Sequence, residues 1–546
     1  MKKTCKRLGA IFLAMAMAVS VLCTGAMASD FTINITSKTT GHTYEAYQVF
    51  TGTLDSTKKI LSDIQWGSAI KDKSDDFLTA LKADSTIGSD FTDITTADKV
   101  AEKLATYTGE NDNKAKAFAA VVGNFIDTNS VTTTLTSGEP VTNTGDNTTY
   151  TYKIDTNAAG YYFVRDTAKD VSHTEYILSV VGSTDVTSKD GTVPTVDKDV
   201  TTTGQKAETA NIGDSVKFIL TGTLPDNLDS YKTYEYEFVD TLSKGLTYNG
   251  DVKVYVQNGD SKVEIANSSY TVTPAGKQTD TDASSTLNVK FNNLKAATAA
   301  KEGETVSISS TSKIIVEYTA TLNQYAEIGT TGNTNKVKLE YSNDPNKDGT
   351  GTTTEKEVFV YTFQIDVDKY ATGEETKKLP GAEFILTREV KTGEGEATKT
   401  QYAIVEDGKL KEWSDSKENA TTLKTDNQGK ISVAGLEAGT YYLKETKAPD
   451  GYNLLTDKVT VTITATMGTG TEANVLKTLT STVNNENNNN IDLTEGIVTV
   501  KVANSAGSQL PSTGGMGTTL FYVIGGALMA GAAIVLVIKK KRSSAE

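Results

Sequence analysis

The sequence predicts a mainly β protein, in which tandem immunoglobulin-like β-sandwich domains form a rod and a transmembrane helix follows at the C-terminal end. Short stretches of alternating residues recur along most of the 546 positions, and 24 Tyr and 44 Gly far exceed 8 Pro and 7 Met. Such a length holds about three domains between the two ends. An apolar run over about 519–538 is long enough to cross a bilayer as one helix.

The N-terminal end has the pattern of a secretory signal peptide, predicted to span 1–28. Four basic residues precede an apolar run over 8–22, and Ala26-Met27-Ala28 forms a small-x-small cleavage site before Ser29. The only cysteines, Cys5 and Cys23, lie in this leader. The mature chain therefore has no thiol, which excludes disulfides and thiol catalysis.

The C-terminal end, 507–546, combines three features in a fixed order. Leu510-Pro511-Ser512-Thr513-Gly514 comes first, then the apolar run, then four basic residues at 539–542 that favour the cytoplasmic side. This order resembles the cell wall sorting signal of Gram-positive surface proteins. The resemblance implies that sortase cuts between Thr513 and Gly514 and that the protein is secreted and anchored to peptidoglycan. An ordinary anchor helix preceded by a chance LPSTG is the alternative.

Charge and histidine content exclude several function classes. The net charge of −15 argues against nucleic acid as a partner. His42 and His173 are the only histidines and lie far apart in the sequence. The chain thus has few histidines from which to build a histidine-based metal site or a Ser-His-Asp hydrolase. We therefore expect no conventional enzyme.

Between its ends the chain divides into three segments, which we call the first (29–192), second (193–360) and third (361–506). The first opens with Phe31, Ile33 and Ile35 on one strand face and has helical patterns near 96–107 and 114–126; the other two are mostly strand. The first and third share a fragment, at 159–164 and 438–443, which suggests related β-sandwich domains.

Polar residues continue the apolar stripes of several predicted strands. Side chains alternate between the faces of a strand, so positions two apart look the same way. In the third segment Lys369, Glu445 and Asn504 each follow apolar residues in phase. In the second segment Lys198 and Asp240 do the same, and Asn335 precedes a run of apolar residues in phase. Burying such groups singly is costly, so each set is expected to interact within itself.

A lysine, an asparagine and a carboxylic acid in an apolar core can form an intramolecular isopeptide bond. Burial lowers the lysine pKa and raises the carboxyl pKa, which gives a neutral amine nucleophile and a protonated acid. The acid polarises the carboxamide and shuttles protons while ammonia leaves. Folding supplies the proximity.

Two family resemblances accompany these sets. Stretches 365–369, 379–384 and 442–452 make the third segment similar to a collagen-adhesin B-type (prealbumin-like) domain, and 194–198, 239–243 and 332–335 make the second similar to the fimbrial isopeptide-forming domain. Together with the sorting signal, the chain resembles the sortase-assembled major pilins, the backbone fimbrial subunits. The resemblance implies Lys369–Asn504 and Lys198–Asn335 bonds, catalysed by Glu445 and Asp240.

Two points stay open in this assignment. Asn333 lies on the same strand face as Asn335 and competes with it. The first segment has no lysine in phase with its opening strand, and Arg165-Asp166 stands where the acid would be, so we predict no isopeptide bond there.

The family resemblance also implies polymerisation, in which an exposed lysine attacks the acyl-enzyme formed at Thr513. The Tyr-Pro-Lys-Asn-like motif that usually carries it is missing. Lys189, in a polar turn before Pro194, is the candidate, and Lys169 is a weaker rival. The implied partners are pilus-type and housekeeping sortases, identical subunits, peptidoglycan, and tip or basal pilins. A monomeric wall-anchored adhesin and an anchored hydrolase are the rival functions.

No cofactor is expected, with one open alternative. Asp344, Asn346, Asp348, Gly349 and Glu355 match the spacing of a calcium-binding loop. The flanking residues read as strand and Pro345 occupies the second position, so a plain hairpin loop is the preferred interpretation.

Overall fold

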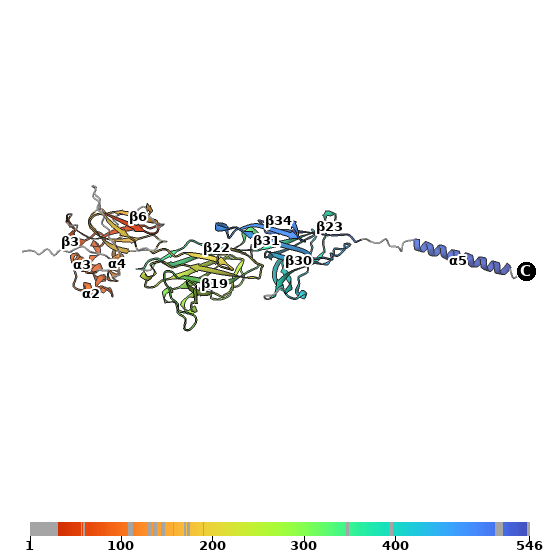
Figure 1. Ribbon diagram of the computed structural model, residues 1–546, viewed down its shortest axis with the longest axis horizontal. Coiled ribbons are helices and arrows are strands. Elements are labelled where there is room, and N and C mark those ends of the chain that lie inside the picture. Colours follow the sequence, from red (N-terminus) through yellow and green to blue (C-terminus); the bar gives the residue numbers. More distant parts are fainter. Residues whose placement is uncertain are drawn as a thin grey trace, which may run out of the picture.

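The predicted architecture, mainly β with one apolar C-terminal helix, is confirmed. The computed structural model describes residues 31–507 and 517–542, with internal gaps at 56, 58–59, 108–112, 128–132, 135–138, 143–147, 157, 169–170, 172–174, 189–190, 346–348 and 393–396. The three segments lie one after another along the long axis in Figure 1, and helix α5 (Gly517–Arg542) lies beyond the third. The exact domain boundaries stay predictions.

The first segment packs two sheets against each other. One has the order β5-β6-β1-β9, and the other has the order β3-β2-β7-β8 with β4 paired to β2. Alternation puts Ile33, Ile35, Tyr152 and Ile154 into the core between them. The bounds are β1 Thr32–Ser37, β2 Tyr44–Asp55, β3 Ile60–Trp66, β4 Thr133–Thr134, β5 Glu139–Thr142, β6 Thr148–Asp155, β7 Gly160–Asp166, β8 Glu175–Val180 and β9 Thr184–Thr187.

Four helices pack with the β3-β2-β7-β8 sheet around a second core. The predicted helices near 96–107 and 114–126 are α3 (Ala97–Leu104) and α4 (Asn113–Phe125), while α1 (Ser74–Ala83) and α2 (Gly88–Phe91) were not predicted. Their aromatic side chains meet those of the sheet in one cluster, which includes Phe50, Phe77, Phe91, Phe118 and Phe163. This packing stabilises helices that are too short to be stable alone.

The second segment is a sandwich of two sheets around one core. The sheets have the orders β10-β12-β19-β15-β16, with β14 on β19, and β11-β22-β20-β13-β18-β17, with β21 on β20. The bounds are β10 Val196–Val200, β11 Ala207–Thr209, β12 Ser215–Gly222, β13 Tyr236–Leu242, β14 Leu246–Tyr248, β15 Lys253–Asn258, β16 Ser261–Glu264, β17 Thr271–Thr273, β18 Ser285–Phe291, β19 Lys313–Leu322, β20 Asn333–Ser342, β21 Thr350–Thr352 and β22 Lys356–Tyr361.

The third segment is one continuous hydrogen-bonded sheet that folds around its own core. Its order is β33-β32-β31-β30-β25-β26-β27-β29-β23-β35-β34, with β24 on β23 and β28 on β25. The bounds are β23 Phe363–Ala371, β24 Glu374–Lys378, β25 Glu383–Lys391, β26 Thr398–Glu406, β27 Lys409–Ser414, β28 Leu423–Lys424, β29 Lys430–Leu436, β30 Gly439–Lys447, β31 Val459–Met467, β32 Leu476–Val483, β33 Glu486–Asn488, β34 Ile491–Asp492 and β35 Ile497–Asn504.

The second and third segments meet in a joint without a linker. Only Thr362 separates β22 from β23, and Tyr361 belongs to the apolar core of the third segment. Backbone hydrogen bonds cross the joint: Ile212 N donates to Gly435 O at 2.9 Å, and Thr330 N donates to Thr494 O at 3.0 Å. The two sandwiches are therefore tied by backbone as well as side-chain contacts.

Within the described residues α5 is the one helix long and apolar enough to cross a membrane. The qualifying stretch, Phe521–Lys541, has a mean hydropathy of 2.4, and none of it is buried against the rest of the chain. Large apolar side chains exposed along a whole helix suit a lipid environment. This agrees with the helix predicted from 519–538.

Candidate functional site: two buried lysine–acid–asparagine clusters

The first and last long strands of the third segment position Lys369 and Asn504. β23 and β35 run parallel as neighbours, with Lys369 opposite Val502 and Ala371 opposite Asn504. Apolar residues two apart on each strand fill the core, so the lysine and the asparagine that continue these stripes point inward as well. Glu445 enters the same space from β30, and all three side chains are buried.

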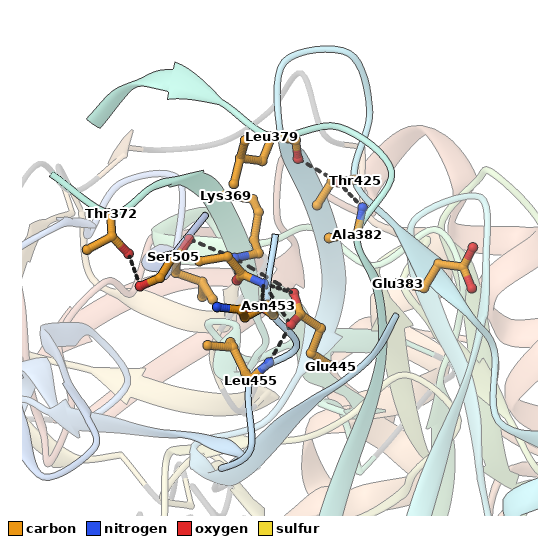
Figure 2. Close-up of polar contacts among 12 residues, drawn as sticks. Lys369, Thr372, Leu379, Ala382, Glu383, Thr425, Glu445, Asn453, Leu455 and Ser505 are labelled. Atoms are coloured by element: carbon orange, nitrogen blue, oxygen red, sulfur yellow. Dashed lines mark hydrogen bonds and ion pairs between the residues drawn. The ribbon is translucent and has the colours of Figure 1, made fainter. Parts of the chain in front are cut away.

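These three side chains form one hydrogen-bonded cluster, and Figure 2 shows Lys369 and Glu445 in it, with Asn453 and Leu455 beside them. Lys369 Nζ donates to Asn504 Oδ1, and also to Val502 O at 3.3 Å. Asn504 Nδ2 donates to Glu445 Oε1 at 3.1 Å and to Oε2 at 2.9 Å. The lysine thus contacts the carbonyl end of the carboxamide, and the acid contacts its nitrogen end.

Two loop residues complete the third-segment cluster. Leu455 N donates to Glu445 Oε2 at 2.8 Å, and Asn504 Nδ2 also donates to Asn453 O at 2.7 Å. These backbone groups fix the carboxylate and the carboxamide relative to each other. Lys369 Nζ lies 3.7 Å from Glu445 Oε1, so the amine is within reach of both partners.

Burial makes the Lys369 amine unusually easy to deprotonate. Loss of hydration disfavours its charged form and lowers the pKa of Lys369 to about 8, although the nearby Glu445 carboxylate partly offsets this. A substantial fraction of the amine is then neutral near pH 8. Only the neutral amine has the lone pair that attacks a carbonyl carbon.

In the second segment the corresponding cluster bridges the two sheets of the sandwich. Lys198 projects from β10 in one sheet, while Asp240 on β13 and Asn335 on β20 project from the other. β13 and β20 are antiparallel neighbours, and Asp240 is opposite Val337 two residues from Asn335. All three side chains are almost completely buried.

A tyrosine joins the members of this second cluster. Lys198 Nζ donates to Asp240 Oδ1 and, at 3.4 Å, to the hydroxyl of Tyr318 on β19. That hydroxyl donates to Asp240 Oδ2 at 2.5 Å and accepts from Asn335 Nδ2 at 2.6 Å. Asn335 Oδ1 is buried and has no hydrogen-bond partner among the described residues.

The local electrostatics favour the neutral forms of this pair. Burial lowers the pKa of Lys198 to about 8 and raises the pKa of Asp240 above its usual range, even though each group stabilises the charge of the other. The aromatic rings of Phe218 and Tyr318 lie 5.4 Å and 5.7 Å from Lys198 Nζ and complete an apolar surrounding. A neutral amine beside a protonated acid is the state that the predicted chemistry needs.

The competing asparagine is engaged elsewhere. Asn333 Nδ2 donates to Glu327 O at 3.0 Å and to Val360 O at 3.1 Å, and its Oδ1 accepts from Glu327 N at 2.9 Å. Asn333 thus uses its amide to hold backbone at the start of β20. The geometry favours Asn335 as the partner of Lys198.

The first segment has a different arrangement at the matching positions. Arg165 Nη2 donates to Glu45 Oε2 at 2.9 Å, and Asp166 Oδ2 lies 2.6 Å from His42 Nδ1. Among the described residues of this segment no lysine is buried. The absence of a crosslink there stays a prediction.

Several predicted residues lie outside the described residues. These are the signal peptide, Lys169, His173, Lys189, the motif from Leu510 through Pro511 and Thr513 to Gly514, and Asn346 and Asp348 of the calcium-like loop. Next to Lys189, Ser188 N donates to Thr36 O at 2.7 Å, and beyond it Thr192 N donates to Asp226 Oδ1 at 2.8 Å. The described groups include no set of three His, Cys, Asp or Glu that could hold a metal ion.

Three members of the clusters were missed from sequence. Tyr318 is in phase with Ile314 and Val316 on β19, so alternation could have marked it as an inward-facing polar tip. Asn453 and Leu455 act through backbone atoms of a loop, and side-chain patterns carry no signal for such groups.

Family models match the segments in which these clusters lie. Residues 212–345 match "Gram-positive pilin backbone subunit 2, Cna-B-like domain", 364–476 match a prealbumin-like fold domain, and 503–544 match the LPXTG cell wall anchor motif. The "Trypsin-resistant surface T6 protein" of Streptococcus pyogenes serotype M6 is 24% identical over 404 residues, which cover 64% of this chain and 69% of that protein. These matches make the chain similar to the Gram-positive backbone pilins.

The fold of the chain is also similar to that of a solved structure. That structure is the T6 backbone pilin of serotype M6 Streptococcus pyogenes, described as having a modular three-domain structure. The alignment covers 88% of this chain and 100% of the T6 chain, with 18% identity and a TM-score of 0.51. The anchor motif places the pilin at the cell wall, as a structural component of a surface pilus.

Proposed function

We propose that this pilin is a covalently self-crosslinked and covalently polymerised fibre subunit. Sortase cleaves after Thr513, a lysine of the next subunit accepts the acyl group, and the finished fibre is transferred to peptidoglycan. Within each subunit, amide bonds join Lys198 to Asn335 and Lys369 to Asn504. The observation that carries the proposal is the pair of buried clusters. In the third segment the amine, the carboxamide and the acid are in direct contact, and in the second segment Lys198 contacts Asp240 while the Tyr318 hydroxyl joins Asp240 to Asn335.

The third-segment cluster supports the chemistry most directly. Lys369 Nζ attacks the carboxamide carbon of Asn504 while Glu445, bonded to the nitrogen, passes it the proton needed for ammonia to leave. The attacking lysine nitrogen gives a proton back to Glu445, one C–N bond forms and another breaks, so that the amine and the carboxamide become a neutral amide and ammonia. The bond joins the neighbouring strands β23 and β35, which begin and end the segment.

Intact mass tests the intramolecular bonds. Each bond removes one ammonia, about 17 Da, so the fragment 29–505 should weigh two such units less than its sequence requires. Glu445→Ala and Asp240→Ala should each restore one unit, because each removes the proton shuttle of one cluster. Unmodified mass in the parent fragment would end the crosslinking proposal.

Matched controls exist next to each lysine. Asp199 and Asp368 are buried carboxylates adjacent in sequence to Lys198 and Lys369, but they pair with Lys206 and Lys378. Asp199→Ala and Asp368→Ala should keep the full mass deficit. Loss of the deficit in these variants would mean that general destabilisation, and not loss of the shuttle, explains the first result.

Gel analysis of cell wall extracts tests polymerisation. Cells with the cognate sortase should produce a ladder of covalent multimers, and Lys189→Ala should reduce it to a single anchored band, whereas Lys169→Ala should not. If Lys169→Ala alone removes the ladder, the rival lysine is the acceptor. A single band in the unmodified strain would favour a monomeric anchored adhesin.

A further inference from the structure

The two clusters differ in how the acid reaches the carboxamide. In the third segment Glu445 accepts directly from Asn504 Nδ2. In the second segment the acid is aspartate, one methylene shorter, and the Tyr318 hydroxyl occupies the position between Asp240 and Asn335. The same chain thus contains a direct and a bridged version of one arrangement.

Packing holds the Tyr318 hydroxyl in this position. Its ring stacks on Phe218, with centroids 5.5 Å apart and planes at 27°, and meets Tyr248 edge-on at 5.8 Å. Tyr318 is only 2% exposed. A ring fixed on two sides in a closely packed core has little freedom to turn its hydroxyl away. The hydroxyl therefore stays between the acid and the nitrogen that must leave.

We propose that Tyr318 is a catalytic proton relay, which carries the proton from Asp240 to the departing nitrogen of Asn335 during formation of the second-segment crosslink. This inference rests on the proposed Lys198–Asn335 bond and adds a fourth member to its machinery. It also explains how the shorter acid serves a carboxamide that it does not contact directly among the described interactions.

The relay conserves every proton. The neutral Lys198 amine attacks Asn335 Cγ, and the former carboxamide nitrogen becomes tetrahedral and gains a lone pair. Tyr318 gives its hydroxyl proton to that nitrogen and receives one from protonated Asp240. The resulting carboxylate takes a proton from the attacking lysine nitrogen. The C–N bond breaks, ammonia leaves, and Tyr318 and Asp240 end in their starting forms.

The Tyr318 hydroxyl is better suited to relay a proton than to act alone as a general base. Burial, with the nearby Asp240, raises the pKa of Tyr318 well above its ordinary value, so the phenol remains protonated. It can pass a proton on only while it receives another. The hydroxyl donates to Asp240 at 2.5 Å and accepts from Asn335 at 2.6 Å. Both bonds reverse direction during the relay, when protonated Asp240 donates and the tetrahedral nitrogen accepts.

Crosslinking kinetics in the full chain test the proposal. Cells expressing the chain are pulse-labelled, and digested samples are followed by mass spectrometry for the peptide that joins Lys198 to Asn335. Tyr318→Phe keeps the ring and removes the relay, so this crosslink should form about a hundredfold more slowly. The Lys369–Asn504 peptide from the same sample should appear at the unmodified rate.

Two further variants separate relay from packing. Tyr248→Phe removes a neighbouring buried hydroxyl that accepts a hydrogen bond from Val252 N and is outside the described hydrogen bonds of the cluster. This variant should leave the rates of both crosslinks unchanged. Adding Asp240→Glu to Tyr318→Phe supplies the missing methylene, so direct contact with Asn335, as Glu445 has with Asn504, should restore much of the rate.

Each outcome has a separate meaning. An unchanged rate in Tyr318→Phe overturns the relay, as does a slow rate that Asp240→Glu fails to rescue, because the hydroxyl would then serve packing. A slow single variant with a rescued double variant supports it. If the unmodified chain yields no Lys198–Asn335 peptide at any time, the proposed crosslink itself has failed, which is a different result.

Discussion

Burial is what distinguishes Lys198 and Lys369 from the other described lysines. In both clusters removal from water lowers the pKa of the lysine amine to about 8. The carboxyl group that could pair with the charged amine is also buried. An unreacted cluster therefore lowers the stability of the core, because burying charged groups costs desolvation free energy. Formation of the proposed amide would remove the charge and the free energy that its burial costs.

An unreacted lysine should make stability depend on pH. In Asn504→Ala the Lys369 amine cannot react; its pKa is about 8 when folded and near 10.5 when unfolded. Between these values the unfolded state binds more protons, so the free energy of unfolding should rise with pH, by up to about 3 kcal/mol. Below pH 8 the amine is protonated in both states, and the stabilisation is absent.

Denaturant titrations at pH 7 and pH 10 measure this effect. The control carries Lys369→Met together with Asn504→Ala and has no amine to titrate, so it should lack the rise. An equal rise in both variants would assign it to other groups. The comparison isolates one side chain.

Alternation alone was enough to predict that the six side chains of the two clusters point inward, because each continues an apolar stripe, and the structure buries all six in two sets of three. It could not predict Tyr318, whose role depends on the neighbouring β12–β19 pairing, or the backbone groups of Asn453 and Leu455. Lys189 had no stripe to mark it, so its choice rests on a turn and a resemblance.

At the scale of elements, strands were easier to predict than short helices. β20 and β35 have clear period-two patterns. By contrast, α1 and α2 span ten and four residues, and their apolar residues become a face only against the sheet that they cover. The order of strands was not predictable either. Placing β35 beside β23 depends on long-range pairing, for which the local sequence contains no signal.

Close backbone contact defines the joint between the second and third segments. Gly329 and Gly496 both have positive φ, and a Cβ added to Gly496 would lie 2.5 Å from Gly329 Cα. Gly496→Ala should therefore destabilise the joint in two ways. The positive φ causes backbone strain of order 1 kcal/mol, and the added Cβ pushes the two segments apart locally. Hydrogen exchange at Thr330 N, which bonds across the joint, measures the opening.

Gly373 offers the matched control for this prediction. It also has positive φ, at 82°, but a Cβ there would meet no atom within 4 Å. Gly373→Ala should show the backbone strain alone and leave Thr330 exchange unchanged. Equal exchange in the two variants would indicate that strain, and not contact, governs this position.

For the whole molecule, three separate groups of apolar cores predict separable unfolding transitions. If the Lys369–Asn504 bond closes a loop of well over 100 residues, its loss should destabilise the third segment by about 5 kcal/mol on the chain-entropy account of crosslinks. Calorimetry of Glu445→Ala should show one transition moved to lower temperature and that of the second segment nearly in place. If both transitions move by equal amounts, the second and third segments unfold together as one cooperative unit that includes the joint.

The direct passage of β22 into β23 has a mechanical consequence. With both amides formed, tension along the fibre bypasses 199–334 and 370–503, because it crosses from Lys198 to Asn335 and from Lys369 to Asn504. Between the bypassed regions it must run through 336–368, which includes the whole of β22 and Thr362. Extension of β22 and Thr362 is resisted by hydrogen bonds to β20 and β11, by burial of apolar side chains, and by contacts of Tyr361 and Thr362 with the third segment, all of them non-covalent. The joint is therefore where a loaded fibre would lengthen first, and where it could recoil without either crosslinked core having opened.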